Sequence, residues 1–125
     1  MSVVVDTSAW IEWLIDSNTG DALFARWPAP SETIVPTLVQ LELAKWLARE
    51  VPEDAADQAL AHLETCQVIP LDTRLALRAA DACARHKLST ADAIVYATAL
   101  EAGAELMTCD AHFEGLLDVI YVPKA

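Results

Sequence analysis

The sequence has few of the residues that mark several common classes of protein. Its three glycines, Gly20, Gly103 and Gly115, are isolated from one another, which disfavours a glycine-rich loop for nucleotide binding. Its three cysteines form no Cys-x-x-Cys pair, so we interpret them as buried free thiols. No apolar stretch approaches the roughly 20 residues that a membrane span needs. Without a basic segment and an apolar region at its start, the chain is expected to be cytoplasmic, with no membrane partner.

Basic residues are also scarce. The chain has 8 Lys and Arg residues against 19 Asp and Glu residues, which gives a net charge of −11. Averaged over the surface, this charge would repel the phosphates of a nucleic acid. Bound divalent cations would reverse the sign of the potential locally. The composition therefore admits a polyanionic substrate at a metal site, and it favours a basic protein partner.

The order of residue types predicts the fold class. Short β-branched runs alternate with longer stretches of helical period, which is typical of an α/β fold with a parallel sheet and helices on both faces. With 125 residues, 54% of them hydrophobic, the chain can bury one core, so we expect a single domain over residues 1–125. The mean hydropathy of +0.29 suggests helical faces that one protomer cannot cover, and it predicts a homodimer.

Capping signals and β-branched runs set the expected elements. Thr7 or Ser8 is expected to cap the first helix, and a last helix is expected to hold Phe113, Leu116 and Leu117. Strands are expected at residues 3–5, 34–35, 68–69, 105–108 and 119–122. Helices are expected to begin near residues 8, 21, 37, 53, 73, 90 and 111.

Four acidic residues differ from the others in their placement. Asp6 and Asp110 follow two predicted strands directly, at the edge where open α/β sheets bind ligands. Glu42 and Asp92 lie on the apolar faces of two predicted helices. Because few Lys or Arg residues lie nearby in the sequence, a divalent metal is the more economical partner for such carboxylates. All-oxygen ligation favours Mg²⁺ or Mn²⁺ over Zn²⁺.

Each acid also has a purely structural interpretation. Asp6 and Asp110 could cap the helices that follow them, and Asp92 could complete a capping box with Ser89. Glu42 lies in mid-helix, where it has no capping role. Its structural interpretation is a side chain that lies along the apolar face and extends its carboxylate into solvent. The conjunction of all four favours the metal site. Thr7, Ser8 and Thr108 would then orient the carboxylates or contact phosphate.

The same segments resemble a known family, the PIN-domain nucleases, and within it the VapC-type toxins of prokaryotic toxin–antitoxin pairs. The resemblance rests on the order and spacing of four segments: VVVDTSA at residues 3–9, QLEL at 40–43, LSTADAI at 88–94 and LMTCDAHF at 106–113. It implies a Rossmann-like fold and a metal-dependent endoribonuclease that cleaves single-stranded or structured RNA. It also implies a homodimer and a cognate antitoxin in the active-site groove, where we expect a basic segment to replace the metal.

Other functions remain as alternatives. A housekeeping RNA-processing nuclease, or a PIN module without activity, would have the same fold. A receiver-like signalling domain would need a pair of acids after the first strand, where Asp6 stands alone. His112 could approach the substrate, although an ordinary surface or helix-capping role is the simpler interpretation. Trp10 and Trp13 could anchor a partner, with core packing as the simpler interpretation.

Overall fold

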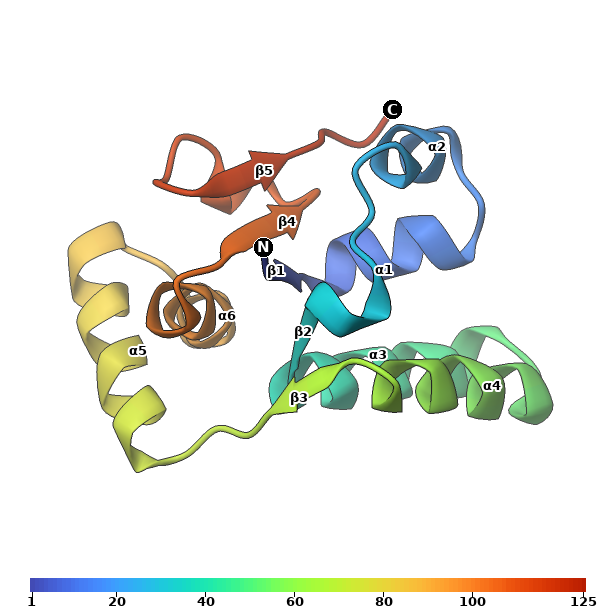
Figure 1. Ribbon diagram of the computed structural model, residues 1–125, viewed down its shortest axis with the longest axis horizontal. Coiled ribbons are helices and arrows are strands. Elements are labelled where there is room, and N and C mark those ends of the chain that lie inside the picture. Colours follow the sequence, from blue (N-terminus) through green and yellow to red (C-terminus); the bar gives the residue numbers. More distant parts are fainter.

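A five-stranded sheet forms the centre of the protein, whose computed structural model describes all 125 residues (Figure 1). Its spatial order is β3-β2-β1-β4-β5, and every neighbouring pair is parallel. The central strand β1 consists of three valines that are at most 8% exposed, as expected for a strand covered on both faces. The strands are β1 (Val3–Val5), β2 (Thr33–Pro36), β3 (Gln67–Ile69), β4 (Glu105–Thr108) and β5 (Val119–Tyr121).

Helices cover the sheet on both sides and confirm the predicted α/β architecture. In Figure 1, α5 and α6 lie to the left of the strands, α1 and α2 lie to the right, and the α3–α4 hairpin extends beside β3. The α-helices are α1 (Thr7–Leu14), α2 (Asn18–Phe24), α3 (Thr37–Glu50), α4 (Glu53–Glu64), α5 (Thr73–His86) and α6 (Thr90–Ala102). Two short 3₁₀ turns, η1 (Pro30–Glu32) and η2 (Ala111–Phe113), complete the chain.

The core is one cluster of 28 buried hydrophobic residues. Helix α6 contributes an unbroken buried run, residues 93–99, because it is covered by the sheet, by α3 and by α5. Three alanines in this run let neighbouring elements approach closely. The helix ends at Gly103, whose φ of 62° is left-handed, a conformation that glycine adopts without steric cost.

A close contact between α1 and α2 requires a glycine. A Cβ atom added to Gly20 would lie 2.4 Å from the backbone oxygen of Glu12, so no other residue fits without a shift of the helices. Ser17 caps α2 by accepting a hydrogen bond from the Gly20 N–H at 2.9 Å. Because of this cap, α2 begins at Asn18, three residues earlier than the sequence predicted.

Two local predictions are wrong. The expected last helix is only the 3₁₀ turn η2, because Gly115 has a left-handed φ of 85° and Asp118 a φ of 60°. Neither Thr7 nor Ser8 caps α1, because Asp6 occupies the N-cap position and its side chain makes no capping bond. Both hydroxyls are instead used in long-range contacts, described below.

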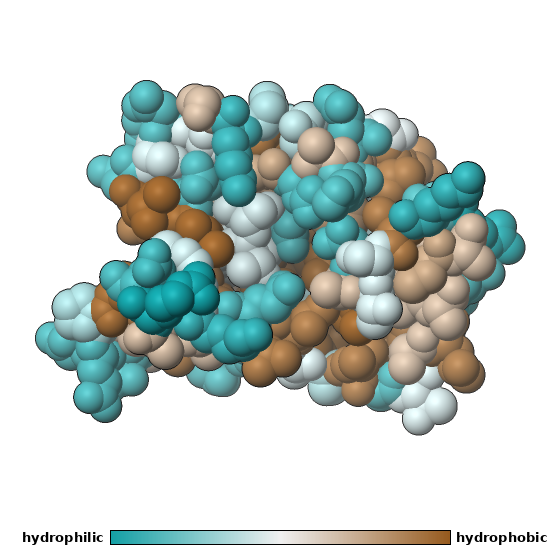
Figure 2. Space-filling model, turned by 180° about the vertical axis from the view of Figure 1, so that it is seen from behind, coloured by the Kyte–Doolittle hydropathy of each residue, from teal (hydrophilic) through white to brown (hydrophobic).

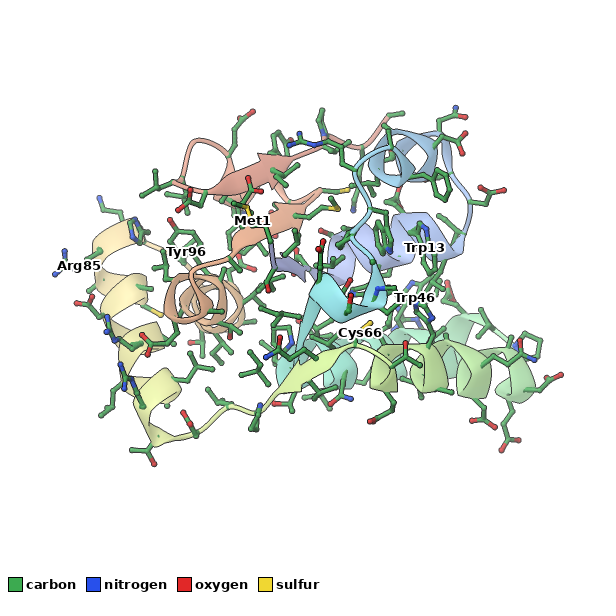
Figure 3. All side chains as sticks on the ribbon, in the orientation of Figure 1. Met1, Trp13, Trp46, Cys66, Arg85 and Tyr96 are labelled. Atoms are coloured by element: carbon green, nitrogen blue, oxygen red, sulfur yellow. The ribbon has the colours of Figure 1, made fainter.

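The aromatic residues near α1 pack against one another. Trp10 is 1% exposed, and its indole nitrogen has no hydrogen-bond partner. Trp13 stacks on Trp27 with ring centroids 4.8 Å apart and also lies against His62. Figure 3 shows Trp13 on the same side of the molecule as Trp46. Core packing, the simpler interpretation of Trp10 and Trp13, therefore describes Trp10 well.

All three cysteines are free: Cys109 is buried, and Cys66 and Cys83 are half-buried. None of the helices combines the length and the apolar character that a membrane crossing requires.

The carboxyl ends of the parallel strands meet at one edge of the sheet. Asp6 follows β1, Asp110 lies two residues beyond β4, and the tail at 122–125 follows β5. The chain connects β1 to β2 on one side and places β4 on the other, so the strand order reverses between β1 and β4. Open α/β sheets bind ligands in the crevice at such a reversal.

Candidate metal centre

Asp6 is the most enclosed of the four acids. Its side chain is 6% exposed, and its backbone N–H donates to the Met107 carbonyl of β4 at 2.9 Å. The Ser8 and Thr108 hydroxyls each donate to the same carboxylate oxygen, Oδ2, at 2.9 Å. Two hydroxyl donors and one backbone contact therefore fix this carboxylate between β1 and β4.

The two hydroxyls also accept hydrogen bonds from the backbone. Ser8 Oγ accepts the N–H of Cys109, and Thr108 Oγ1 accepts the N–H of Asp110, both at 3.0 Å. A hydroxyl has one proton to donate, and in this arrangement both protons go to Asp6. The resulting network connects the start of α1 to the turn after β4, so the position of Asp6 and that of Asp110 are coupled.

Glu42 comes to the site from the middle of α3. Its Oε1 accepts a 2.7 Å hydrogen bond from the Thr7 hydroxyl, which holds the half-buried carboxylate at the start of α1. Burial raises the pKa of Asp6 from 3.8 to about 6 against the opposing hydrogen bonds of Ser8 and Thr108, and the charge of Glu42 adds to the rise. We call Asp6 and Glu42 the inner pair.

Asp92, Asp110 and His112 form a second group, which we call the outer cluster. His112 Nδ1 lies 3.1 Å from Asp110 Oδ1 and 3.4 Å from Asp92 Oδ2. One ligand atom from each residue lies within 4.8 Å of the others. Burial and the charge of Asp110 raise the pKa of Asp92, and His112 opposes the shift. The exposed fractions are 19% for Asp92, 30% for Asp110 and 77% for His112.

The structural interpretations of the acids are only partly met. Asp110 accepts the His112 N–H at 2.9 Å and thus caps η2, and Ser89 accepts the Asp92 N–H at 3.3 Å as in a capping box. Asp6 makes no cap bond. The capping contacts of Asp110 use one oxygen, and its carboxylate still faces Asp92 through His112.

The four acids thus come together as two connected halves. Asp6 and Glu42 are close enough for their charges to interact, Asp92 and Asp110 face each other across His112, and Thr108 bonds to Asp6 and to the Asp110 backbone. The sequence interpretation gave His112 only a minor role. The signal that could have indicated a contact with Asp110 is the position of His112 two residues later, since a tight turn returns such a side chain toward the acid.

The residues fit a divalent cation. No Lys or Arg residue forms an ion pair with any of the four acids; the single basic group in contact is His112. Asp6 is buried without a cationic partner, and burial of an unpaired carboxylate is costly. Carboxylate oxygens suit Mg²⁺ and Mn²⁺, and an imidazole nitrogen suits Mn²⁺ better than Mg²⁺. These residues can therefore hold a hard divalent ion.

Two pockets border the acids. One, of about 520 Å³, is the tail pocket, lined by Ser8, Cys109, Asp110, Ala111, Tyr121, Pro123 and Lys124. The other, of about 180 Å³, is lined by Lys87, Leu88, Ser89, Asp92 and His112. Both open to solvent, so a ligand can reach the outer cluster from two directions.

Comparisons with solved structures show how widely this fold is shared. The chain is similar to a toxin–antitoxin complex from Klebsiella pneumoniae, with a TM-score of 0.86 and 21% identity over 99% of this chain and 100% of that chain. VapC20 from Mycobacterium tuberculosis, a sarcin–ricin loop cleaving toxin, gives a TM-score of 0.78 and 24% identity over 98% and 100% of the two chains. DNA-bound VapBC from Salmonella typhimurium gives 0.73 and 16% over 97% and 96%.

Sequence comparison identifies the family directly. No curated protein matches the chain in sequence. The model of the PIN domain family matches residues 3–116, a range that contains all four acids, the three hydroxyl residues around them and His112. The match covers most of the chain, and the architecture agrees with it. The chain therefore belongs to the PIN domain family.

Proposed function

We propose that the protein is a Mg²⁺- or Mn²⁺-dependent endoribonuclease and the toxin of a VapBC-type toxin–antitoxin pair. The observation that carries the proposal is the convergence of four carboxylates, from β1, α3, α6 and the turn after β4, where no Lys or Arg neutralises them. Membership of the PIN domain family and similarity to a structure described as a sarcin–ricin loop cleaving toxin support the choice of RNA as substrate.

In this proposal Asp6, Glu42, Asp92 and Asp110 hold one or two ions. An ion held by these carboxylates would supply Lewis-acid chemistry: it would polarise the scissile phosphate and lower the pKa of a water molecule. Ser8 and Thr108 keep the Asp6 carboxylate in one orientation through their 2.9 Å bonds. Thr7 does the same for Glu42. No side-chain nucleophile is needed.

Cleavage assays test this function. The purified protein is expected to cut single-stranded RNA in Mg²⁺ or Mn²⁺, to stop when EDTA is added, and to recover when excess Mn²⁺ is returned. The matched control is Asp81→Asn, which removes an exposed carboxylate on α5 that pairs only with Arg85; this variant is expected to cleave at the wild-type rate. Undiminished cleavage in EDTA would contradict the metal-dependent mechanism.

The acidity of the site suggests how an antitoxin inhibits it. A basic segment of the partner would place an Arg or Lys among Asp6, Glu42, Asp92 and Asp110, where its charge substitutes for that of the metal. An arginine can pair with a carboxylate through two parallel hydrogen bonds, and it brings no water to activate. Similarity to toxin–antitoxin complexes supports a partner of this kind.

Competition between the metal and the antitoxin tests this mode of inhibition. Because coupling between two ligands is reciprocal, Mn²⁺ is expected to weaken binding of the partner by the factor by which the partner weakens binding of Mn²⁺. Isothermal titration of the partner into the protein at several Mn²⁺ concentrations measures both. An affinity that is indifferent to Mn²⁺ and to Asp92→Asn would place inhibition elsewhere.

We also propose a homodimer. An apolar hollow of about 430 Å³ lies between α5 and α6, and Leu71, one of its lining residues, is 44% exposed. Figure 2 shows hydrophobic surface gathered on the side of the molecule where these helices lie. Light scattering during size-exclusion chromatography tests the proposal, and a 13.6 kDa monomer throughout the micromolar range would contradict it. The hollow is lined by Leu71, Ala76, Ala79, Ala80, Cys83, Thr90 and Ile94.

A further inference from the structure

A ribonuclease with a net charge of −11 must still bind a polyanion, so the free cations of the surface matter. Four of the five arginines form ion pairs with nearby carboxylates: Arg49 with Glu50, Arg74 and Arg78 with Glu101, and Arg85 with Asp81. Figure 3 shows Arg85 pointing away from the body of the molecule. The basic side chains without an ion pair are those of Arg26, Lys45, Lys87 and Lys124.

Two of these cations line the pockets beside the acids. Lys124 lies in the tail pocket and Lys87 in the smaller pocket. Small-molecule sites in proteins occupy roughly 300–1,000 Å³. The tail pocket, at about 520 Å³, falls within this range, whereas the smaller pocket, at about 180 Å³, does not. Only the former has room for a nucleotide.

The tail that carries Lys124 is held at both ends. The Val122 N–H donates to the Thr108 carbonyl at 2.9 Å, which continues the pairing of β5 with β4. The Ala125 N–H donates to the hydroxyl of Thr19 at 2.8 Å, and Thr19 is buried in α2. Lys124 therefore projects from a segment fixed between the sheet and α2, close to where the C-terminus meets α2 in Figure 1.

The lining of the tail pocket combines groups that recognise a nucleotide. Tyr121 supplies an aromatic ring, Pro123 supplies an apolar ring, and Lys124 supplies a positive charge. Ser8 and Asp110 connect the pocket to the proposed metal-binding acids. Aromatic rings stack with any base, and lysines contact the phosphates in proteins that bind single strands.

We propose that the tail pocket is a nucleotide subsite for single-stranded RNA, in which a base stacks on Tyr121 and the adjoining phosphate pairs with Lys124. The inference rests on the proposed ribonuclease function and names how that site holds its substrate. It also suggests how an acidic protein binds RNA: the tail, whose backbone is hydrogen-bonded at both ends, carries one cation into the pocket that borders the acids. The nucleotide held there flanks the scissile bond.

The stacking contact is tested by substitutions of Tyr121. Tyr121→Leu keeps an apolar residue in β5 but removes the flat ring, and Tyr121→Phe keeps the ring. Affinity for a fluorescently labelled single-stranded oligonucleotide, measured by anisotropy in Ca²⁺, is expected to fall about 5- to 150-fold with Leu, the range for loss of one base–aromatic stacking contact. It is expected to stay within about twofold of wild type with Phe.

The charge contact is tested by the salt dependence of binding. Lys124→Gln is expected to reduce the slope of log affinity against log salt concentration by about 0.7, the value for one phosphate of a single strand. Lys124→Arg is expected to retain the slope, and so is the matched control Lys45→Gln, which removes an exposed lysine of α3 that lines neither pocket. In cleavage assays the Leu and Gln variants should raise KM and leave kcat unchanged.

The outcomes separate the subsite from the proposed function. Wild-type affinity for Tyr121→Leu, or a wild-type salt slope for Lys124→Gln, would overturn the subsite while cleavage by the wild-type protein continued to support the ribonuclease. Absence of RNA cleavage by the wild type would overturn the proposed function instead. Circular dichroism and thermal melting of each variant establish that it is folded before binding is compared.

Discussion

The inner pair and the outer cluster are built from the same carboxylate chemistry but in opposite surroundings. Asp6 is 6% exposed and receives two hydroxyl hydrogen bonds on one oxygen. Asp92 and Asp110 are partly open to solvent, and an exposed imidazole bridges them. The enclosed half is fixed before any ligand arrives, whereas the open half is where an ion or a basic side chain can enter.

This contrast assigns different tasks to the two halves. Preorganised ligands lose little freedom when they bind an ion, and their own partners hold them in orientation. The outer cluster is the half through which we expect a cation to enter and leave, because His112 is 77% exposed.

Removal of one charge from either half is expected to have the largest effect. Asp6→Asn and Asp92→Asn should each lower kcat by about two orders of magnitude or more, since in the proposed mechanism each substitution removes a metal ligand and not merely a group that orients one. RNA cleavage in Mn²⁺ measures this, with Asp81→Asn as the control. Cleavage at the wild-type rate by either variant would show that its acid is structural.

The two halves should differ in what the same substitution does to stability. Because burial raises the pKa of Asp6 from 3.8 to about 6, the folded protein binds more protons than the unfolded chain between these pH values. The free energy of unfolding of the metal-free protein therefore falls as pH rises through this window, and the cost at pH 7 is about 3 kcal/mol.

Asp6→Asn removes this cost. Urea denaturation in EDTA is expected to show that the variant is more stable than the wild type at pH 7, by up to about 3 kcal/mol, and gains little at pH 4, where the wild-type carboxyl is already largely protonated. Asp92→Asn should stabilise less, because Asp92 is more exposed. Equal gains for Asp6→Asn at pH 4 and pH 7 would argue against a buried ionised carboxylate.

Substitution in the hydroxyl network should have a smaller effect than removal of an acid, because Thr108 bonds to Asp6 and to the Asp110 backbone but carries no charge. Thr108→Val removes one of the hydrogen bonds that lower the pKa of Asp6. A hydrogen bond to a charged group contributes about 1.5–3 kcal/mol, so the pKa of Asp6 should rise by about one to two units. The acid limb of the plot of log kcat/KM against pH would therefore shift to higher pH by the same amount. As a control, Thr65→Val removes an exposed hydroxyl at the end of α4 that donates to the His62 carbonyl.

The sequence predicted much of the site and little of its surroundings. The valine run and the acid after it are local, so Asp6 at the end of β1 could be read from the residues. The division into an inner pair and an outer cluster could not be predicted from the residues, because it depends on where α3 and α6 lie relative to the edge of the sheet. The final helix was overestimated because the apolar spacing of Phe113, Leu116 and Leu117 is helical, while the left-handed Gly115 stops the turn.

The pocket residues were missed for a similar reason. Tyr121 and Lys124 carry no motif, and their proximity to Asp110 follows from the β4–β5 register, in which Thr108 pairs with Tyr121. His112 was noticed and set aside, because spacing alone does not show that η2 turns it back over Asp110. Long-range placement, rather than residue type, separates Tyr121 and Lys124 from ordinary surface residues.

Direct titration of Mn²⁺ is the sharpest test of the central claim, that two unlike halves form one metal centre. Calorimetry on the wild type should show an affinity that rises with pH through about 6, the pKa of Asp6, because the ionised carboxylate attracts the ion. Asp6→Asn and Asp92→Asn should each reduce that affinity at pH 7.5, although Asp6 and Asp92 lie in different halves. Binding that persists in Asp6→Asn with wild-type affinity and no pH dependence would contradict the account.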